Sequence, residues 1–586
     1  MKGKQPGIKR AVLMVFAGIL LFGGSTDDLF GNSQPAPISG TPMLRHQTLQ
    51  LLRDFGKGAT IQAEINRGRE ILADYVSQQV SFWAYNFGTY QYYQTTATCK
   101  SVTGLANGTA YNLNIYSEDG KSVSTEAITN TQNEFINRIL PKETTYFGSP
   151  PVGDFTILIL DIQDGGGATF IAGYFDPTNE YPKSSNPSDP TYYSNTRHMI
   201  YMDLNTVQPP GTVSFYGTLA HEFQHFIHNS KDPQESIQAT WVNEGLSGLA
   251  RFVCGYGHPV SHVRAFAANP TTSLVTWQDN LENYGATYLF MLYLAEHYGG
   301  ADTARAIVAN SGIGITGINN ALLQRGYAVT VNNIFKNWVI ANYLNNSSIS
   351  GGIYGYTDSF AGIPSAPGNF QTTNSHSTYP ASGGGPVNQY AANYIKFTNL
   401  GGTYDTFILA PYNLSESNAH SYSYTGMLGS FILNLSGIND QMGMSGIQEA
   451  SSSPPPVVIA TLSASNTINN TSGGSSSGGG GGCFIATTAY GSPLAEEVYI
   501  LREFRDRYLL TNLPGRSFVS LYYACCPLVV NLISKHDSLK ILTRITLYPA
   551  VKMSYAVIKA PRNTGLLILS SSLLFGLVLI RRRRRG

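Results

Sequence analysis

The stretch that decides the fold is His221-Glu222-Phe223-Gln224-His225, followed after eighteen intervening residues by Glu244 in Trp241-Val242-Asn243-Glu244-Gly245-Leu246-Ser247. Side chains four residues apart on a helix lie on one face, one turn apart, so His221 and His225 can contact a single ion. A glutamate that follows at this distance can add a third ligand. We therefore expect a helix over about residues 213–228 that carries two metal ligands.

The expected site has the layout of a catalytic zinc centre. Three protein ligands, His221, His225 and Glu244, leave the fourth position of a tetrahedral Zn²⁺ ion open. Glu222 is then placed to act as general base on a water bound at that position, whose pKa the ion lowers. The pattern predicts zinc as the cofactor, peptide-bond hydrolysis as the reaction, and a protein or peptide as the substrate.

The spacing excludes a metzincin, which would continue as HExxHxxGxxH. Here His228 stands at the glycine position and Lys231 at the position of the third histidine. The third ligand must therefore come from elsewhere, and Glu244 is the candidate. His228 is the competing histidine, and we expect it to cap the helix or line the active-site cleft.

Hydrolysis of an amide also needs a donor for the tetrahedral oxyanion. Tyr284 is the residue that we assign to this catalytic role, with Tyr288 on the same helical segment as the alternative. Packing tyrosines in a tyrosine-rich chain are the competing interpretation. Three histidines are rivals for the donor role: His258, His262 and His297. We expect Asn243 and Ser247 to orient the ligands.

Composition limits the class of protein. The chain has 586 residues, enough for about three or four domains, and only 12% of them are charged, against a usual share of about a quarter. Residues 26–482 hold 18 Lys and Arg against 31 Asp and Glu, which argues against nucleic acid as a partner.

None of the five cysteines forms a CxxC pair, which argues against a zinc site built from cysteines. The sequence does not decide whether Cys99 and Cys254 form a disulfide. The oligomeric state is not predicted.

Both ends of the chain resemble targeting segments. Residues 1–25 combine four basic residues, an apolar run and small residues, which is typical of a signal peptide; an uncleaved anchor helix is the alternative. Residues 564–580 carry no charge and precede five arginines, so residues 564–586 are predicted as a transmembrane helix with an arginine-rich tail. Together they predict export to the cell envelope or beyond, with the membrane as a partner that tethers the chain at least transiently.

Between the ends, the pattern favours an α+β protein: a zincin (gluzincin-like) catalytic domain, then a β-sandwich-like domain and a helical C-terminal tail. We expect a mostly antiparallel sheet that leads into the metal helix. The expected segments are a helical or linker region that is a candidate propeptide (26–80), the zinc metallopeptidase domain with a β-rich start (81–343), a Gly/Ser/Asn-rich loop (344–384), the sandwich (385–463), a Ser/Gly linker (464–482) and a C-terminal module (483–563).

At these residues the chain resembles the hyicolysin family of neutral zinc metallopeptidases. Four segments carry the resemblance: residues 172–175, 218–225, 241–247 and 284–290. The resemblance implies a gluzincin-type fold over roughly residues 80–340, one zinc ion, and proteolysis outside the cell.

A second resemblance begins at Cys483-Phe484-Ile485-Ala486-Thr487-Thr488-Ala489-Tyr490-Gly491-Ser492. This segment is similar to a bacterial C-terminal module named for its Cys-Phe-Ile box, which implies a sorting or anchoring device. Cys483 is then either a processing or attachment point, or a small buried residue of a helical module.

Two other functions compete with the endopeptidase. Zinc aminopeptidases share the eighteen-residue spacing, but no acidic motif before the metal helix is dedicated to a substrate amino group. A surface adhesin or binding protein with a structural zinc ion is the alternative without catalysis. The intact Glu222 argues against it, because a structural site does not need that carboxylate.

Overall fold

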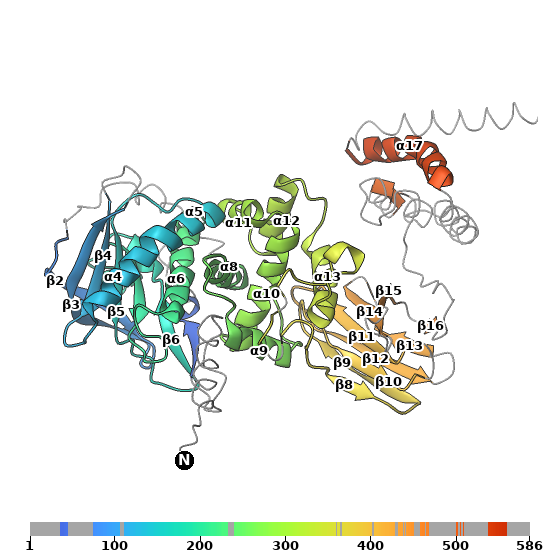
Figure 1. The fold of residues 1–586 in the computed structure, drawn as a ribbon, viewed down its shortest axis with the longest axis horizontal. Helices are drawn as coiled ribbons and strands as arrows, with labels where there is room; N and C mark the ends of the chain where they lie inside the picture. The colour runs from blue at the N-terminus through green and yellow to red at the C-terminus, as the bar shows by residue number, and fades with distance from the viewer. Residues whose placement is uncertain are drawn as a thin grey trace, which may run out of the picture. The chain divides into compact units, whose positions relative to one another are not determined.

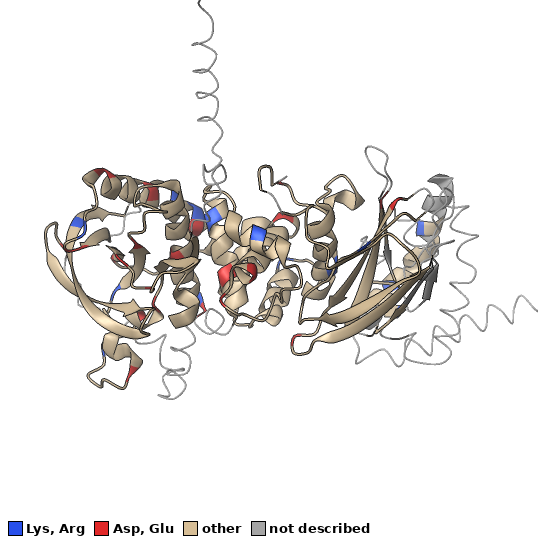
Figure 2. Cartoon of the chain, turned by 90° about the horizontal axis from the view of Figure 1, so that it is seen from below, with Lys and Arg blue, Asp and Glu red and all other residues tan. Residues whose placement is uncertain are grey.

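The computed structural model describes residues 35–44, 74–105, 111–232, 239–358, 360–363, 366–400, 404–427, 432–437, 439, 441–449, 457–462, 465–467, 500–501, 504–505, 508 and 537–559. The chain divides into two compact units, residues 1–478 and 479–586. Charged side chains are sparse over the described ribbon, as Figure 2 shows, in keeping with the low charged fraction.

A seven-stranded sheet forms the first layer of the N-terminal part of the chain (Figure 1). β5 and β7 lie at its centre, and every residue of both strands is buried, which accounts for their continuous apolar runs. The order is β1-β6-β7-β5-β4-β3-β2, with bounds β1 Ala36–Ser39, β2 Gln79–Asn86, β3 Gln91–Gly104, β4 Asn112–Glu118, β5 Phe155–Leu160, β6 Thr169–Tyr174 and β7 His198–Asp203.

The expectation of a mostly antiparallel sheet is wrong, because three of the six strand pairs are parallel: β1–β6, β4–β5 and β5–β7. A parallel pair needs a crossover connection that carries the chain back to the same edge. Between β4 and β5 that connection is helical, made of α4 Thr125–Glu134, η3 Phe135–Ile139 and α5 Leu140–Phe147.

The first strand of the sheet comes from the region 26–80 that the sequence assigns to a linker. β1 pairs in parallel with β6 at the edge of the sheet. Pro37 within it hides it from a strand search, although proline is tolerated on an edge strand. Most of the helix expected between residues 26 and 80 falls on residues 45–73, outside the described residues, and β2 already begins at Gln79.

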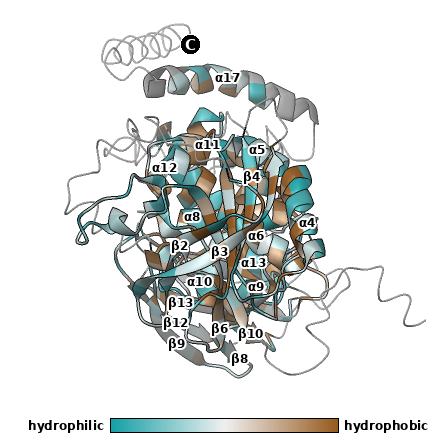
Figure 3. Cartoon of the chain, turned by 90° about the vertical axis from the view of Figure 1, so that its left-hand side faces the viewer, coloured by the Kyte–Doolittle hydropathy of each residue, from teal (hydrophilic) through white to brown (hydrophobic). Residues whose placement is uncertain are grey.

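The helical layer places the metal helix against the sheet. α6 Val213–Lys231 contacts β6 and β7, and the Thr212 hydroxyl accepts a hydrogen bond from Phe215 N at its start. Apolar residues, brown in Figure 3, gather where the helices meet the sheet. The other helices of this lobe are α8 Thr240–Val253, α9 Val260–Ala268, α10 Leu281–His297, α11 Gly300–Ala309, α12 Ile315–Gln324 and α13 Val331–Leu344.

A β-sandwich follows the helical lobe. Phe397 and Leu409 from one sheet share a buried core with Tyr424 and Leu435 from the other. The five-stranded sheet has the order β15-β14-β11-β10-β8 and the four-stranded sheet the order β16-β13-β12-β9. The bounds are β8 Asn374–His376, β9 Ala381–Val387, β10 Ile395–Thr398, β11 Thr406–Asn413, β12 His420–Met427, β13 Ile432–Ser436, β14 Met442–Glu449, β15 Val457–Thr461 and β16 Ser465–Thr467.

The sandwich extends beyond its expected bounds at both ends. β8 and most of β9 lie in the region 344–384 expected to be a loop, and β16 lies in the expected linker 464–482. These strands consist mainly of Gly, Ser, Asn and Thr, so they lack the alternation of apolar and polar residues that marks a strand. Their pairing to neighbouring strands, rather than their own side chains, defines them.

The main described element of the second unit is α17 Asp537–Lys559, with Pro549 inside it. Among the helices that the structure describes, none combines the length and the hydropathy needed to cross a membrane. The predicted signal peptide (1–25), the Cys-Phe-Ile box and the predicted transmembrane helix (564–586) lie outside the described residues.

Candidate metal centre

The structure brings the three expected ligands together. His221 and His225 project from α6 and Glu244 from α8, and one ligand atom from each lies within 4.8 Å of the others. His221 Nε2 lies 3.0 Å from Glu244 Oε2, and His225 Nε2 lies 3.2 Å from Glu244 Oε1. His225 and Glu244 are buried, whereas His221 is partly exposed.

The electrostatics of the three groups suit a cation. Burial alone would raise the pKa of Glu244, but His225 and His221 beside it hold the pKa well below its ordinary value. Burial opposes ionisation of His221, yet Glu244 raises the pKa of this histidine. Glu244 Oε1 is buried and accepts no hydrogen bond among the described residues. Two imidazoles and one carboxylate with converging donor atoms are a donor set that fits Zn²⁺.

Asn243 and Ser247 contact Nδ1 of His225, the ring nitrogen that faces away from Glu244. His225 Nδ1 contacts Asn243 Oδ1 and lies 3.0 Å from Ser247 Oγ. Donation from Nδ1 to the amide oxygen leaves Nε2 with its lone pair, the form that binds a metal. Asn243 Nδ2 in turn lies 2.7 Å from His228 Nδ1. His228 is therefore connected to the site through Asn243 and is not one of the three residues that converge.

Glu222 is fully buried beside the ligands and is held by hydroxyl groups. Its Oε2 accepts hydrogen bonds from Thr41 Oγ1 at 2.8 Å and from Ser39 Oγ at 3.3 Å, and lies 4.0 Å from His225 Nε2. Burial raises the pKa of Glu222 to about 7, although the neighbouring His221 opposes this shift. A carboxylate with a pKa near neutrality can both take and release a proton.

Gly173 of β6 lets the sheet approach the side chain of Glu222 closely. A Cβ atom at this position would lie 2.9 Å from Tyr201 O and 3.1 Å from both Glu222 Cγ and Thr218 Cγ2. Any other residue would push β6 away from α6. The glycine thus keeps the edge of the sheet next to the carboxylate.

Tyr284 and His262 are the described donors that face this region. Tyr284 Oη donates to Ser39 O at 2.9 Å, and His262 Nε2 donates to Pro37 O at 2.8 Å. Their rings stack with centroids 4.9 Å apart. Burial, and then the charge of Glu244, raises the pKa of Tyr284 well above its ordinary value, so the phenol keeps its proton.

The other expected donors lie elsewhere. Tyr288 Oη contacts His258 Nδ1 at 2.5 Å, and His297 Nε2 donates to the carbonyl of Gly355 at 3.0 Å. Among the described residues, none of these three forms a hydrogen bond with Glu222 or the expected ligands. Cys99 and Cys254 are both buried free thiols, so the disulfide left open above is not formed.

Sequence reasoning missed three polar residues near the site: Ser39, Thr41 and Arg251. No local pattern marks the two hydroxyl residues, which lie more than 180 positions from Glu222. Arg251 follows Glu244 by seven residues, two helical turns on one face, and this spacing is a signal that was available.

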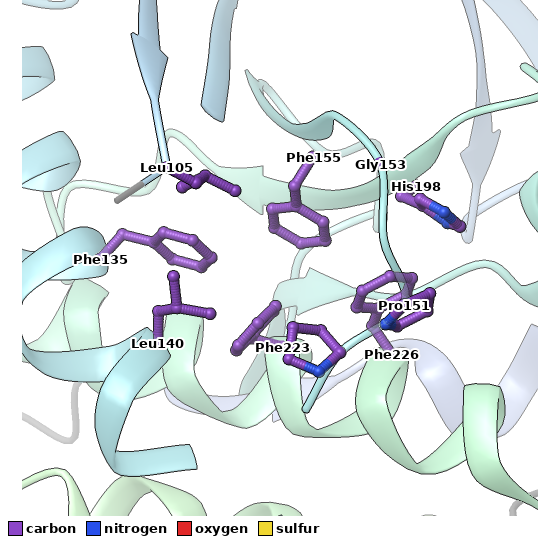
Figure 4. A pocket seen from close by; sticks show the side chains of 10 residues that line it. Leu105, Phe135, Leu140, Pro151, Gly153, Phe155, His198, Phe223 and Phe226 are labelled. Carbon is purple, nitrogen blue, oxygen red and sulfur yellow. The ribbon is translucent and has the colours of Figure 1, made fainter. Parts of the chain in front are cut away.

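A small apolar pocket behind α6 is separate from this centre (Figure 4). None of the three expected ligands lines it. His198 is its one titratable side chain, and its Nδ1 pairs with Glu180 Oε2 at 2.8 Å. The lining residues are Leu105, Phe135, Leu140, Pro150, Pro151, Gly153, Phe155, His198, Phe223 and Phe226.

Comparisons with known proteins give distant matches among solved structures. No family model matches the chain, and no curated protein matches it. Among solved structures, the M1 zinc metallopeptidase from Deinococcus radiodurans matches with a TM-score of 0.26 and 10% identity, over 43% of this chain and 59% of that one. A point mutant of the same enzyme matches with a TM-score of 0.26 and 8% identity, over 43% and 58%. The matched region thus spans less than two thirds of those chains, and a likeness at this TM-score supports no inference about function.

Proposed function

We propose that this protein is an exported zinc-dependent metalloendopeptidase that hydrolyses peptide bonds of extracellular proteins. The observation that supports this most directly is the convergence of His221, His225 and Glu244 beside the buried carboxylate of Glu222. A structural zinc site is closed by four protein ligands, whereas three ligands next to an acid–base group suit catalysis. Export and membrane tethering are part of the proposal and rest on the sequences of the two ends.

The residues of the site divide the chemistry among them. When bound, the zinc ion polarises the scissile carbonyl and lowers the pKa of the attacking water. Glu222 accepts the proton of that water and passes it to the leaving amine, for which a pKa of about 7 is suited. Tyr284 and His262 are the donors for the oxyanion, because both already donate to backbone carbonyls next to Glu222.

The test compares the zinc-loaded full chain with its Glu222→Gln variant on casein and on N-blocked peptides. We expect the variant to keep its zinc and to lose about 10²- to 10⁴-fold in turnover, the usual contribution of a general base. Equal non-zero rates for the two proteins, or a chain that binds no zinc, would contradict the proposal. Cleavage of unblocked peptides alone would replace the endopeptidase with an aminopeptidase.

A further inference from the structure

β1 lies on the outer edge of β6, where β6 has no other neighbour in the sheet. Pro37 pairs with Phe170 and Ile38 with Ile171. Two backbone hydrogen bonds flank these pairs, from Ala36 N to Ala168 O at 3.0 Å and from Gly40 N to Gly173 O at 2.9 Å. Adding an extended strand to a free sheet edge is a general way for a protein to bind a peptide.

This segment, residues 36–41, also forms hydrogen bonds with the proposed base, Glu222, and with both proposed oxyanion donors, Tyr284 and His262. The hydroxyls of Ser39 and Thr41 donate to Glu222 Oε2. The carbonyls of Ser39 and Pro37 accept hydrogen bonds from Tyr284 and His262. A strand that served only to extend the sheet would not need side-chain contacts to the base together with backbone contacts to both donors.

We propose that residues 36–41 are an internal inhibitory peptide that occupies the place of the substrate backbone and keeps the enzyme latent until it is displaced. The proposal rests on the proposed function. Both hydroxyl groups donate to Glu222 Oε2, so a water molecule would have to displace them to reach this oxygen. While Tyr284 and His262 donate to the segment, they cannot donate to the carbonyl of a substrate. Substrate and segment therefore compete for the same donors and acceptors.

The segment is short enough to be displaced. β1 has four residues and pairs with β6 alone, so few backbone hydrogen bonds retain it. Its side chains fit closely, because a Cβ atom at Gly40 would lie 2.5 Å from Phe87 Cζ and 2.9 Å from Ile171 Cγ2. A larger residue at position 40 would thus force the segment off the edge of β6 without changing a residue of the metal centre.

The test uses the zinc-loaded full chain, its Gly40→Val variant, and Gly104→Val as control. Gly104 ends β3 of the same sheet, and a Cβ atom there would meet nothing within 4 Å. The first readout is binding of a short N-blocked peptide hydroxamate, which needs an accessible zinc ion but no catalysis. We expect at least about tenfold tighter binding by Gly40→Val than by the wild type or Gly104→Val, because only the open state binds. Cleavage of an N-blocked peptide should rise by a similar factor.

A synthetic peptide of residues 35–44 supplies the reverse experiment. Added to Gly40→Val, it should restore inhibition and compete with the hydroxamate, and a version with Ser39→Ala and Thr41→Val should compete at least about tenfold more weakly. If Gly40→Val does not fold, the same two substitutions in the full chain provide the second variant, with a smaller gain in hydroxamate binding.

The outcomes separate the two proposals. Unchanged hydroxamate binding in a folded, zinc-loaded Gly40→Val variant would overturn the inhibitory role of the segment, whatever the activity. Tighter hydroxamate binding without any cleavage would leave the inhibitory role in place and overturn the proposed peptidase. The Glu222→Gln comparison is repeated in the Gly40→Val background for this reason.

A second, independent observation concerns Arg251 on α8. It lies on the same helical face as Glu244, and a Cβ atom at Gly217, one turn before His221, would lie 2.2 Å from its Nη1. The guanidinium therefore lies against α6 near the first ligand. Among the described residues it has no hydrogen bond or ion pair, and its Nε is buried without an acceptor. Arg251 is partly buried, so the loss of water around its Nε is not offset by an acceptor among the described residues, and an anionic ligand would supply one.

We infer that Arg251 is a specificity-determining residue that binds a carboxylate of the substrate. This carboxylate can belong to an acidic side chain of the substrate or to its free C-terminus. The test measures kcat/KM and hydroxamate binding for matched peptides with Glu or Gln, and with a free or amidated C-terminus, in the Gly40→Val background. Arg251→Gln should lose at least about tenfold on one carboxylate pair and stay unchanged on the neutral peptides. An equal loss on all peptides would overturn the assignment.

Discussion

The two sides of the metal centre have different tasks. On the α8 side, Glu244 is an expected ligand, and Asn243 and Ser247 contact the ring of His225. On the β1 side, Ser39 and Thr41 contact Glu222, the proposed base, and none of the three expected ligands. Metal retention and access to the base are therefore separable, because they depend on different elements. Changes on the α8 side should release zinc, whereas changes on the β1 side should leave zinc in place.

The largest effect is expected for His225→Ala. His225 is buried and its Nε2 faces Glu244, so its loss removes one expected ligand and one of the two imidazoles beside that carboxylate. We expect zinc to fall from about one ion per chain to nearly none by elemental analysis after dialysis, with activity lost in parallel. His297→Ala is the control, because His297 bonds to Gly355 O and not to the centre. Full zinc retention by His225→Ala would contradict the assignment of His225 as a zinc ligand.

A smaller effect on the same side is expected for Asn243→Ala. The variant keeps all three ligands but loses the acceptor at His225 Nδ1 that selects the metal-binding tautomer. Zinc affinity should fall by about 10- to 100-fold, the usual cost of losing such a partner. Competition with a chelating dye measures it. An affinity equal to that of the wild type would show that the second contact of His225, to Ser247, is sufficient.

Thr41→Val tests the opposite side. Thr41 Oγ1 donates to Glu222 and accepts from Phe175 N, so the substitution leaves a buried N–H without its acceptor. The free energy of unfolding should fall by about 1–3 kcal/mol, measured by urea denaturation. Zinc affinity should stay within about twofold of the wild type, since no ligand is changed. A tenfold loss of zinc affinity would show that contacts on the β1 side also determine zinc binding, contrary to our expectation.

Glu143 is a buried carboxylate outside the candidate metal centre, and it serves as a reference for Glu222 and Glu244. It is fully buried on α5, and neither carboxylate oxygen has a hydrogen-bond partner among the described residues. Burial raises the pKa of Glu143 well above its ordinary value. The folded state thus holds a proton that the unfolded state releases, so stability declines as pH rises above the ordinary glutamate pKa of about 4.3.

The corresponding variant is Glu143→Gln, which removes this titration. We expect it to be more stable than the wild type at pH 8 by about 1 kcal/mol or more, and to reduce the pH dependence of the urea midpoint. Zinc content should be unchanged. A variant that is less stable than the wild type at pH 8 would mean that the carboxylate has a partner in the folded protein.

Local patterns predicted the elements that they define by themselves. The metal helix was expected over residues 213–228 and spans 213–231, because its histidine spacing and its Thr212 cap are both local. β5 and β7 carry the continuous apolar runs that a strand buried on both faces needs, so their local sequence marks them as well. The convergence of His221, His225 and Glu244 could be anticipated because they lie on two helices that are close in sequence.

Long-range pairing escaped prediction. β1 is defined by β6, more than 130 residues away, and β8 and β9 by partners in the sandwich. Their own residues, rich in Pro, Gly and Ser, carry no periodic pattern. The contacts of Ser39 and Thr41 with Glu222 depend on that pairing, so no spacing rule reveals them. Arg251 could be placed on the face of Glu244, but its lack of a partner is visible only in three dimensions.

The central claim is that His221, His225 and Glu244 hold one zinc ion with a position left open for hydrolysis. X-ray absorption at the zinc edge of the full chain tests it most directly. The account predicts nitrogen and oxygen ligands at about 2.0–2.2 Å, with two imidazoles per zinc and one after His225→Ala if residual metal is retained. Sulfur ligands at about 2.3 Å, or a spectrum that His225→Ala leaves unchanged, would contradict it.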